Sequence, residues 1–305
     1  MNLKRELRGV LADPTEWAIS VRERWAERHE QRAKATQPRA SLRGIMPWPP
    51  CPYVTDPDWE RHLHEGIGVP WPCPAQLQFH SMWPEVIRML QERVPRVGRG
   101  SFGVEGWADG DTAFARTVYC LTLHLRPERI VETGVARGIT SRFILEAIAH
   151  NGQGHLWSID LPPIAEPEIH DQVGVAVTDD LRHNWTYVRG SSRRRLSPLL
   201  SELGTIDMFV HDSKHTERNL LFELNRAWDA LGPTGVVVAD DVDLNCGFHA
   251  FSAAQPDANI CICVSEPLEP DTVRQGSTGV FAVGLKLHPA TRTQERGKSN
   301  KDTTK

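Results

Sequence analysis

The chain has 305 residues, of which 40% are hydrophobic and 24% are charged, and its formal net charge is −4. This composition is typical of an ordinary soluble protein with one large domain and an extension, or with two domains. No stretch approaches the ~20 apolar residues of a membrane span, and the first residues lack the apolar run of a signal peptide. We therefore expect a cytoplasmic protein that has no membrane partner.

The charge is distributed unevenly. Residues 1–43 and 286–305 are basic, whereas the residues between them carry 19 Lys and Arg against 31 Asp and Glu. An acidic body argues against a nucleic-acid partner and favours a small-molecule substrate. The six cysteines form no CxxC pair and no dense disulfide framework, and the alternation of Cys261 and Cys263 along a predicted strand indicates reduced thiols.

A helix is predicted to begin at Asp13, because Asp-Pro-Thr-Glu supplies an N-cap, a first-turn proline and an acidic residue three positions after the cap. Trp17, Val21 and Trp25 follow at i, i+4 and i+8 and form one apolar stripe to about Arg32. The stripe favours a helix packed on its own protein. A dimer helix and a substrate lid are the alternatives.

Residues 38–74 are rich in proline and tryptophan, so we expect an irregular segment without regular helix or strand. Two cysteines and two histidines of this region invite interpretation as a zinc site: Cys51, His62, His64 and Cys73. Their spacing matches no zinc-finger pattern, and each cysteine stands beside a proline, as a loop residue does. We therefore predict no zinc site from this spacing.

A helix is predicted over residues 82–94, and the five glycines of residues 98–110 indicate a linker. This divides the chain into an extension (1–100), a main domain (101–288) and a polar, disordered tail (289–305). The extension is predicted to be a lid or an interaction segment. If it is, a chain without it should still fold and bind its cofactor.

From residue 111 onward, helical and strand patterns alternate. Helices are expected over residues 111–125, 139–151, 193–203, 216–231 and 245–254. Strands are expected over 130–131, 156–160, 185–189, 206–211, 235–240, 260–264 and 280–285. This alternation predicts an α/β fold with a mainly parallel sheet. The last two strands have no convincing helix between them, so one is expected to run antiparallel and close the sheet.

The turn after the first of these strands has the composition of a cofactor cradle. It contains Gly134, Ala136 and Gly138 and leads into a helix, so that small residues and free N–H groups face a ligand. It lacks the G-x-G-x-x-G dinucleotide fingerprint, and Glu132 before it suits a positively charged amino group better than a pyrophosphate. A tight turn in another kind of α/β protein is the alternative.

The next two strands also end in polar residues, where open α/β sheets bind ligands. Asp160 ends the second strand and is placed to bind a ribose diol with both carboxylate oxygens. Ser191 and Ser192 follow the third strand and suit an adenine edge.

Three carboxylates, Asp212, Asp240 and Asp241, follow the fourth and fifth strands. If these strands are neighbours, they lie ~5 Å apart, so the three side chains converge. Such carboxylates repel one another unless a cation neutralises them, and oxygen ligands suit Mg²⁺. Asp207, at the other end of its strand, is expected to be a cap or a surface ion pair. His211 is expected to be a core histidine.

The turn around Gly134, with the acidic, acidic and small-polar strand ends, resembles class I S-adenosylmethionine-dependent methyltransferases. The runs Asp207–Asp212 with His215 and Val238–Val242 resemble the metal-dependent small-molecule O-methyltransferases, such as catechol and macrocin O-methyltransferases. The resemblance covers residues 111–285 and implies a Rossmann-like methyltransferase fold. It implies metal ligands at Asp212, Asp240 and Asp241, with Asp212 and His215 catalytic and His215 the base candidate. It implies cofactor contacts at Glu132, Gly134, Ala136, Gly138, Asp160, Ser191 and Ser192.

The resemblance thus implies an enzyme that uses S-adenosyl-L-methionine and Mg²⁺ to methylate a hydroxyl of a sugar or phenol. Metal-independent N- or O-methylation, a NAD-binding oxidoreductase and a non-catalytic cofactor-binding subunit are the alternatives. The missing fingerprint glycine counts against the oxidoreductase. The identity of the acceptor cannot be read from the chain, and a homo-oligomer is left open.

Overall fold

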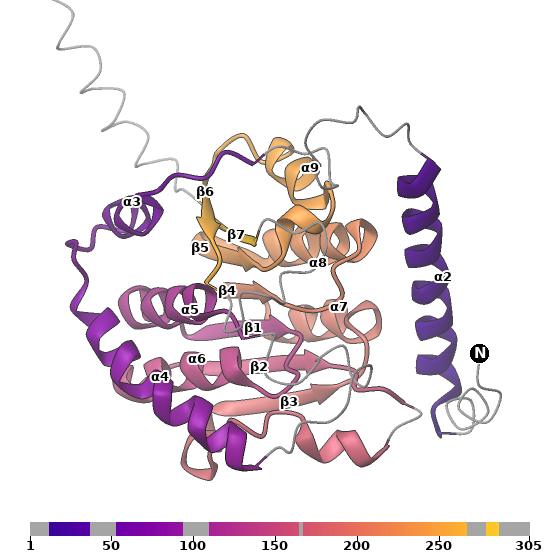
Figure 1. Cartoon of the computed structure of the whole chain (residues 1–305), viewed down its shortest axis with the longest axis horizontal. Helices are drawn as coiled ribbons and strands as arrows, with labels where there is room; N and C mark the ends of the chain where they lie inside the picture. Colours follow the sequence, from indigo (N-terminus) through magenta and orange to yellow (C-terminus); the bar gives the residue numbers. More distant parts are fainter. Residues whose placement is uncertain (1–11, 37–52, 94–109, 165–166, 267–278, 287–305) are drawn as a thin grey trace, which may run out of the picture.

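The computed structural model describes residues 12–36, 53–93, 110–164, 167–266 and 279–286, which contain one seven-stranded sheet (Figure 1). The strands are β1 (Arg129–Thr133), β2 (His155–Asp160), β3 (Trp185–Arg189), β4 (Ile206–His211), β5 (Leu231–Ala239), β6 (Ala258–Val264) and β7 (Val280–Lys286). Their order is β3-β2-β1-β4-β5-β7-β6. Strands β1 to β5 pair in parallel, and β7 is antiparallel to both β5 and β6. The predicted mainly parallel sheet with an antiparallel closing strand is confirmed.

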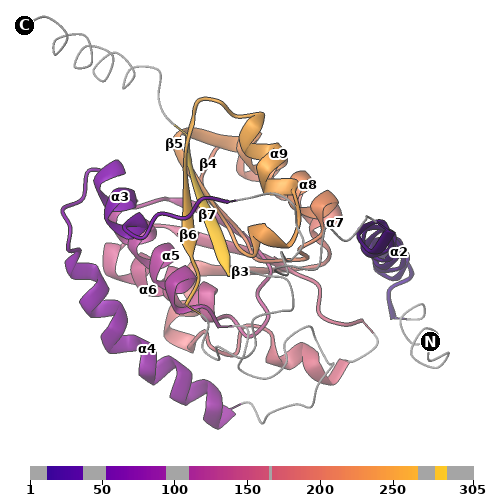
Figure 2. The same cartoon turned by 45° about the horizontal axis from the view of Figure 1, so that its top comes forward.

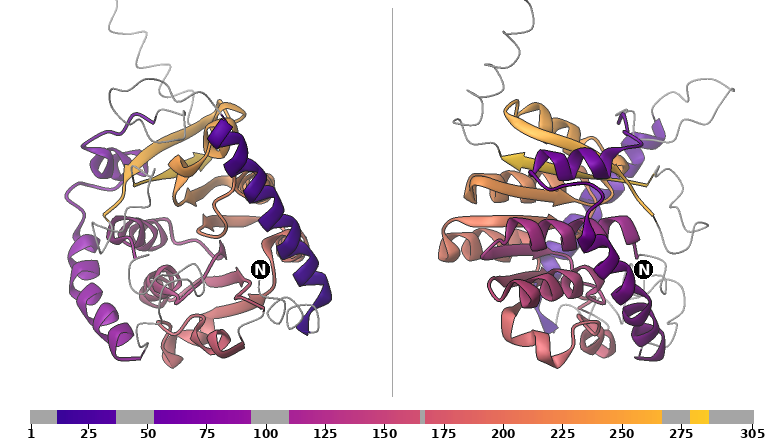
Figure 3. Two further views of the ribbon diagram at one scale, coloured as in Figure 1. Left: turned by 45° about the vertical axis from the view of Figure 1, so that its right-hand side comes forward. Right: turned by 90° about the vertical axis from the view of Figure 1, so that its left-hand side faces the viewer.

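Helices cover both faces of the sheet (Figures 1 and 3). One face carries α3 (Trp59–Gly66), α4 (Pro74–Arg93), α5 (Thr112–Leu125) and α6 (Ile139–Asn151). The other face carries α7 (Ser192–Leu203), α8 (Glu217–Ala230) and α9 (Gly247–Ala253), with α2 (Pro14–Thr36) lying outside them near α7 (Figure 2). Short 3₁₀ helices occupy Pro167–Gln172, Asp179–Asn184 and Val242–Leu244.

Local sequence explains most of these boundaries. The run Val236–Ala239 is completely or almost completely buried, as expected for a parallel strand covered by helices on both faces. Helices α5 and α8 begin after side-chain caps, in which Asp111 accepts from two backbone amides and Thr216 from one. Asp207 accepts hydrogen bonds from the amides of Glu128 and Arg129 at the start of β1, which confirms the predicted cap.

The N-terminal region departs from the sequence-based expectation. Residues 53–74 were expected to be irregular, but α3 forms there because Pro57 and Pro70 lie outside its eight residues. Helix α4 begins at Pro74, eight residues before the predicted start, because proline is accepted in the first helical turn. The predicted glycine-rich linker and C-terminal tail lie almost entirely outside the described residues.

Helix α2 does not pack as its apolar stripe predicted. Trp25 is 65% exposed, whereas Glu16, outside that stripe, is 2% exposed. The Glu16 carboxylate accepts a hydrogen bond from the Ser191 amide (3.2 Å) and lies 3.4 Å from Arg194. The helix therefore contacts the loop after β3 through acidic residues.

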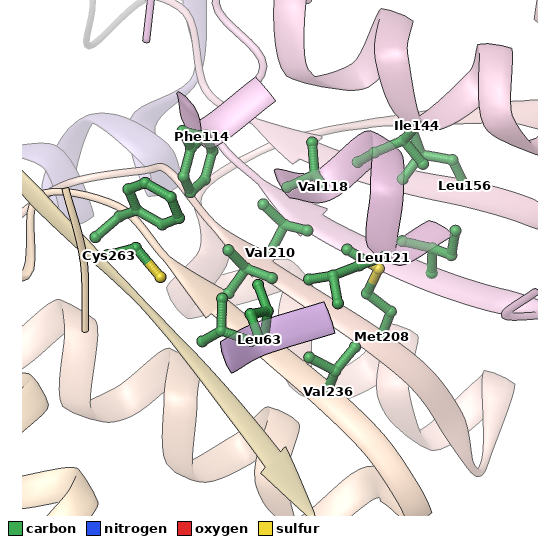
Figure 4. Packing of buried hydrophobic residues seen from close by; sticks show 14 of the residues in the cluster. Leu63, Phe114, Val118, Leu121, Ile144, Leu156, Met208, Val210, Val236 and Cys263 are labelled. Atoms are coloured by element: carbon green, nitrogen blue, oxygen red, sulfur yellow. The ribbon is translucent and has the colours of Figure 1, made fainter. Parts of the chain in front are cut away.

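Helices α3 and α4 share the hydrophobic core of the main domain. Trp59 and Leu63 belong to the cluster formed by α5, β4 and β5, in which Phe114, Val118 and Leu121 face Met208 and Val210 (Figure 4). Phe79, Val86 and Leu90 of α4 pack in a second cluster that includes Tyr119 and Phe143. This packing favours a structural role for residues 53–93, and a role as lid or interaction segment stays a prediction.

We therefore expect a chain that lacks residues 1–100 to be unfolded or aggregated. Five large side chains of α3 and α4 would leave the core, and each contributes roughly 1.5–3 kcal/mol against a net stability of about 5–15 kcal/mol for a whole domain. Circular dichroism and size-exclusion chromatography of the truncated chain test this. Deletion of residues 1–36 is the matched control, because it leaves α3 and α4 in place and should leave a cooperative unfolding transition. A folded, monomeric 101–305 fragment would show that the extension is dispensable.

The described cysteines include four free thiols, Cys73, Cys120, Cys261 and Cys263. Cys246 is disulfide-bonded. Among the described helices, none combines the length and the apolar character needed to cross a bilayer.

Candidate active site

The carboxyl ends of β2, β1, β4 and β5 bring the predicted site residues to one edge of the sheet. The register pairs Thr133 with Ile159 and His211, and His211 with Ala239. Backbone hydrogen bonds continue one residue beyond the strands, with Asp212 N donating to Thr133 O (2.8 Å) and Asp240 N to His211 O (2.9 Å). Asp160 at the end of β2, and Gly134, Asp212 and Asp240 directly after β1, β4 and β5, therefore lie in one row along adjacent strands.

Glycine is required in the cradle turn by contacts within the protein. Gly134 has φ +87°, and a Cβ there would lie 1.9 Å from the carbonyl oxygen of Asp212. Gly138 has φ +83°, and its Cβ would lie 2.8 Å from Cα of Gly174. Ala136 also has a positive φ, of 46°. Besides the predicted room for a ligand, the two glycines therefore let the turn pack against Asp212, directly after β4, and against the segment around Gly174.

Glu132 is completely buried beneath this turn. Its Oε2 accepts hydrogen bonds from the hydroxyls of Ser141 and Ser158, both at 2.6 Å, while Oε1 is buried without a hydrogen-bond partner. Burial raises the pKa of Glu132 to about 7, against the opposing effect of the two hydroxyls. The unpaired oxygen can accept a hydrogen bond from a cofactor's amino group.

Asp160 connects the end of β2 to the cradle turn. Its Oδ2 accepts hydrogen bonds from the amides of Val135 (3.1 Å) and Ala136 (2.8 Å). Burial raises its pKa, and these amides oppose the shift. The sequence suggested that both carboxylate oxygens bind a ribose, whereas the structure commits Oδ2 to the turn.

Ser191 and Ser192 lie at the start of α7, and one polar group of each residue interacts with another residue of the protein. The amide of Ser191 donates to Glu16, while its hydroxyl is buried without a hydrogen-bond partner. The Ser192 hydroxyl contacts Asn219 Oδ1 at 3.5 Å and hydrogen-bonds to Glu223. Contacts of the two serines with adenine stay a prediction.

A cation-sized cluster lies next to the cradle. Ligand atoms of Asp212, His215 and Asp240 all lie within 4.8 Å of one another. His215 Nε2 is 3.9 Å from Asp212 Oδ1 and 3.8 Å from Asp241 Oδ2, so Asp241 contacts this cluster through the histidine. Burial, followed by the charges of Asp241 and Asp212, raises the pKa of Asp240 well above its usual range. The site thus has excess negative charge that a cation would relieve.

Below this cluster lies a buried network that the sequence analysis did not identify. His211 is completely buried, as expected, and its Nδ1 is 2.6 Å from Glu223 Oε2. Glu223 also accepts hydrogen bonds from Thr133 (2.5 Å), Ser213 (2.8 Å) and Asn219 (2.8 Å). The His211 ring meets that of His215 edge-on, with 5.5 Å between centroids. The network therefore supports the segment that carries Asp212 and His215.

The sequence offers only a weak indication of Glu223 and none of Asn245. Glu223 lies on the apolar face of α8, between Leu220 and Leu224, where a solvent-exposed glutamate is not expected. Asn245, 1% exposed, donates from Nδ2 to the carbonyl oxygen of His215 (3.2 Å), and nothing in its local sequence distinguishes it.

Comparison with known proteins gives one family match for this chain. Residues 131–242, which extend from within β1 to just beyond β5, match the family model described as a methyltransferase domain. A search of curated protein sequences gives no significant match.

Several solved structures are similar over most of their length. The O-methyltransferase TomG from Streptomyces achromogenes, in complex with SAM, is 18% identical over 67% of this chain and 88% of its own, with a TM-score of 0.48. The O-methyltransferase from Bacillus cereus, in complex with SAH, is 13% identical over 74% and 96%, with a TM-score of 0.45. A putative caffeoyl-CoA O-methyltransferase from Staphylococcus aureus is 12% identical over 70% and 98%, with a TM-score of 0.46.

Proposed function

We propose that this chain, which contains an S-adenosylmethionine-dependent methyltransferase domain at residues 131–242, methylates a hydroxyl group of a small molecule with the help of Mg²⁺. The observation that carries the proposal is the convergence of Asp212, His215 and Asp240 directly beside the cradle turn. The cradle and the carboxylates follow adjacent strands, so a methyl donor and a metal-bound hydroxyl would lie side by side.

The cradle residues fit the cofactor chemically. Glu132 has an unpaired, buried carboxylate oxygen for an amino group, and Asp160 places a carboxylate beside the cradle turn, where a ribose hydroxyl would lie. Bound S-adenosylmethionine supplies an electrophilic methyl group on a positively charged sulfonium. The acidic surroundings therefore also match the cofactor's charge.

The carboxylates fit a hard cation. Asp212, Asp240 and Asp241 offer oxygen ligands, and their mutual repulsion is relieved when a divalent ion binds between them. Bound Mg²⁺ would orient the acceptor hydroxyl and lower its pKa. Asp212 and Asp240 are the proposed primary ligands, with Asp241 completing the set from the side of His215.

His215 is the proposed base. Asn245 holds its backbone, and its Nε2 stands within 4 Å of two carboxylates, where it can accept the acceptor's proton. The alternative role for His215 is as a metal ligand, since its Nε2 lies among the ligand atoms of Asp212 and Asp240.

Titration with Mn²⁺, followed by its electron paramagnetic resonance, tests the metal site without knowledge of the acceptor. We expect one bound ion per chain, and Asp240→Asn should weaken binding at least tenfold. Asp207→Asn is the matched control, because Asp207 lies at the opposite end of β4 and should leave Mn²⁺ affinity unchanged. Binding of the demethylated cofactor, measured by calorimetry, should be preserved in both variants. Equal Mn²⁺ binding in wild type and Asp240→Asn would favour metal-independent methylation.

His215→Ala separates the two roles of the histidine. If His215 is a base, the variant keeps its Mn²⁺ affinity and loses about 10²–10⁴-fold in kcat. If His215 is a ligand, Mn²⁺ affinity falls with activity. The acceptor can be sought by mass spectrometry after incubation with isotopically labelled S-adenosylmethionine and a panel of catechols, sugars and amines. A product labelled on nitrogen would contradict O-methylation, and no transfer to any acceptor would favour a non-catalytic subunit.

A further inference from the structure

A second cluster of metal-binding side chains lies on the helical face that carries α3, α4 and α5. It contains His64 of α3, Cys73 just before α4, and His124 near the end of α5, with ligand atoms all within 4.8 Å of one another. Because α5 ends just before β1 begins, His124 lies near the amino ends of the strands. The cluster is therefore at the opposite edge of the sheet from Asp212 and Asp240.

A fourth donor adjoins these three. Cys120 lies one helical turn before His124, on the same side of α5, and its thiol interacts with that of Cys73. Cys73 Sγ is also 2.9 Å from His124 Nε2. Cys73 and Cys120 are free thiols, 3% and 2% exposed. One sulfur and two imidazole donors thus lie within 4.8 Å of one another, and the buried Cys120 thiol adjoins them.

The orientation of His64 supplies an independent observation. His64 is 4% exposed, and its Nδ1 lies 2.6 Å from the carbonyl oxygen of Glu60, so Nδ1 carries the proton and donates it. Nε2 therefore holds the lone pair, and it is buried without any hydrogen-bond partner. The Trp71 ring, with its centroid 5.0 Å away, packs against the imidazole. A metal-binding histidine has the same arrangement, with one nitrogen fixed by a carbonyl and the other free for the ion.

We infer that His64, Cys73, Cys120 and His124 bind one Zn²⁺ ion that ties the α3–α4 connection to α5. Two thiolates and two imidazoles are the donors of structural zinc sites, which are closed, tetrahedral and without a water ligand. Zinc ligands stand roughly 3.5 Å apart when Zn–S is ~2.3 Å and Zn–N is ~2.0–2.1 Å. The ligand atoms of His64, Cys73 and His124, all within 4.8 Å of one another, approach this scale, and Cys120 would complete the set from the preceding turn of α5.

The site explains why sequence spacing did not predict zinc. Of the four residues considered there, Cys51 lies outside the described residues, and His62 contacts Asp56 instead. The missing half, Cys120 and His124, comes from a helix about fifty residues later in the chain. The i, i+4 spacing of that pair places both side chains on one helical face.

The experiment is metal analysis of the full-length protein purified without chelators. We expect about one zinc per chain, and a lower thermal unfolding midpoint after the zinc is removed. Cobalt substitution should give a thiolate-to-metal charge-transfer band in the near ultraviolet. That band is specific to this site, because the site at Asp212 and Asp240 has no sulfur ligand.

Variants assign the ligands. Cys73→Ser and His64→Ala should lose zinc, and Cys120→Ser should weaken the cobalt charge-transfer band by removing one thiolate. Cys261→Ser is the control, because Cys261 is a free cysteine in β6, and this variant should retain both the zinc and the band. Circular dichroism verifies that each variant is folded. If the folded wild type binds neither zinc nor cobalt with a thiolate band, the cluster is only a hydrogen-bonded Cys–His pair and the inference is wrong. Wild-type zinc content and spectra in Cys73→Ser would overturn it equally.

Discussion

Replacement of Glu223 with glutamine should lower the free energy of unfolding by about 3–5 kcal/mol. Glu223 is completely buried and accepts hydrogen bonds from Thr133, Ser213 and Asn219 beside the His211 imidazole. Removal of one member of a buried charged network leaves its partners unsatisfied, and the cost falls in this range. Urea denaturation followed by tryptophan fluorescence measures the change.

Glu217→Gln is the matched control, because Glu217 lies in the first turn of the same helix and is exposed. It should change stability by less than about 0.5 kcal/mol. If the two variants are equally stable, the Glu223 network contributes little to the fold.

The Glu223 carboxylate should also make the free energy of unfolding depend on pH. Burial alone would raise the pKa of Glu223, but the His211 imidazole and the Ser192 and Thr133 hydroxyls outweigh it and lower that pKa to about 2. Since glutamate in an unfolded chain has a pKa of about 4.3, the unfolded state binds more protons between these values. The stabilisation, about 3 kcal/mol, is therefore present above pH ~4.3 and is lost as the pH falls toward 2. Glu223→Gln should flatten this part of the stability curve.

Gly134→Ala should have the second largest effect and should damage the fold and the metal site together. The new methyl group would lie 1.9 Å from the Asp212 carbonyl oxygen and 2.4 Å from its carbonyl carbon. A contact this short with backbone cannot be relieved by a side-chain movement, so either β1 or the Asp212 segment must shift. We expect a loss of more than about 3 kcal/mol in unfolding free energy, together with weakened Mn²⁺ binding.

Gly152→Ala is the control that separates the steric contact with Asp212 from the conformational cost of a positive φ. Gly152 also has a positive φ, of 67°, but a Cβ there has no atom within 4 Å. Gly152→Ala should lower the free energy of unfolding only by the conformational cost of a positive φ, about 1–2 kcal/mol, and should leave Mn²⁺ binding intact. Equal effects of the two substitutions would mean that the contact between the cradle turn and Asp212 is relieved easily.

The sequence alone determined the architecture of the main domain. Helix α6 and the strands β3 and β4 have the predicted bounds, because their apolar periodicity and flanking turns are local properties of the chain. The same applies to the candidate site. Asp160 ends β2, and Asp212 and Asp240 immediately follow β4 and β5. Parallel strands place the residues at their carboxyl ends along one edge whatever the loops do.

Only the tertiary structure decided how these side chains are used. Asp160 has one oxygen engaged by the cradle turn, and Gly134 is needed by the Asp212 backbone, because both contacts form between segments distant in sequence. Glu223 belongs to α8 and hydrogen-bonds to His211 below the carboxylates. Residues 53–93 pack against α5 and α6 and complete the core on the other face of the sheet. Periodicity shows which face of an element is apolar. It carries no information about which distant segment covers that face or which buried charges meet there, because those partners are chosen by the packing of the whole chain.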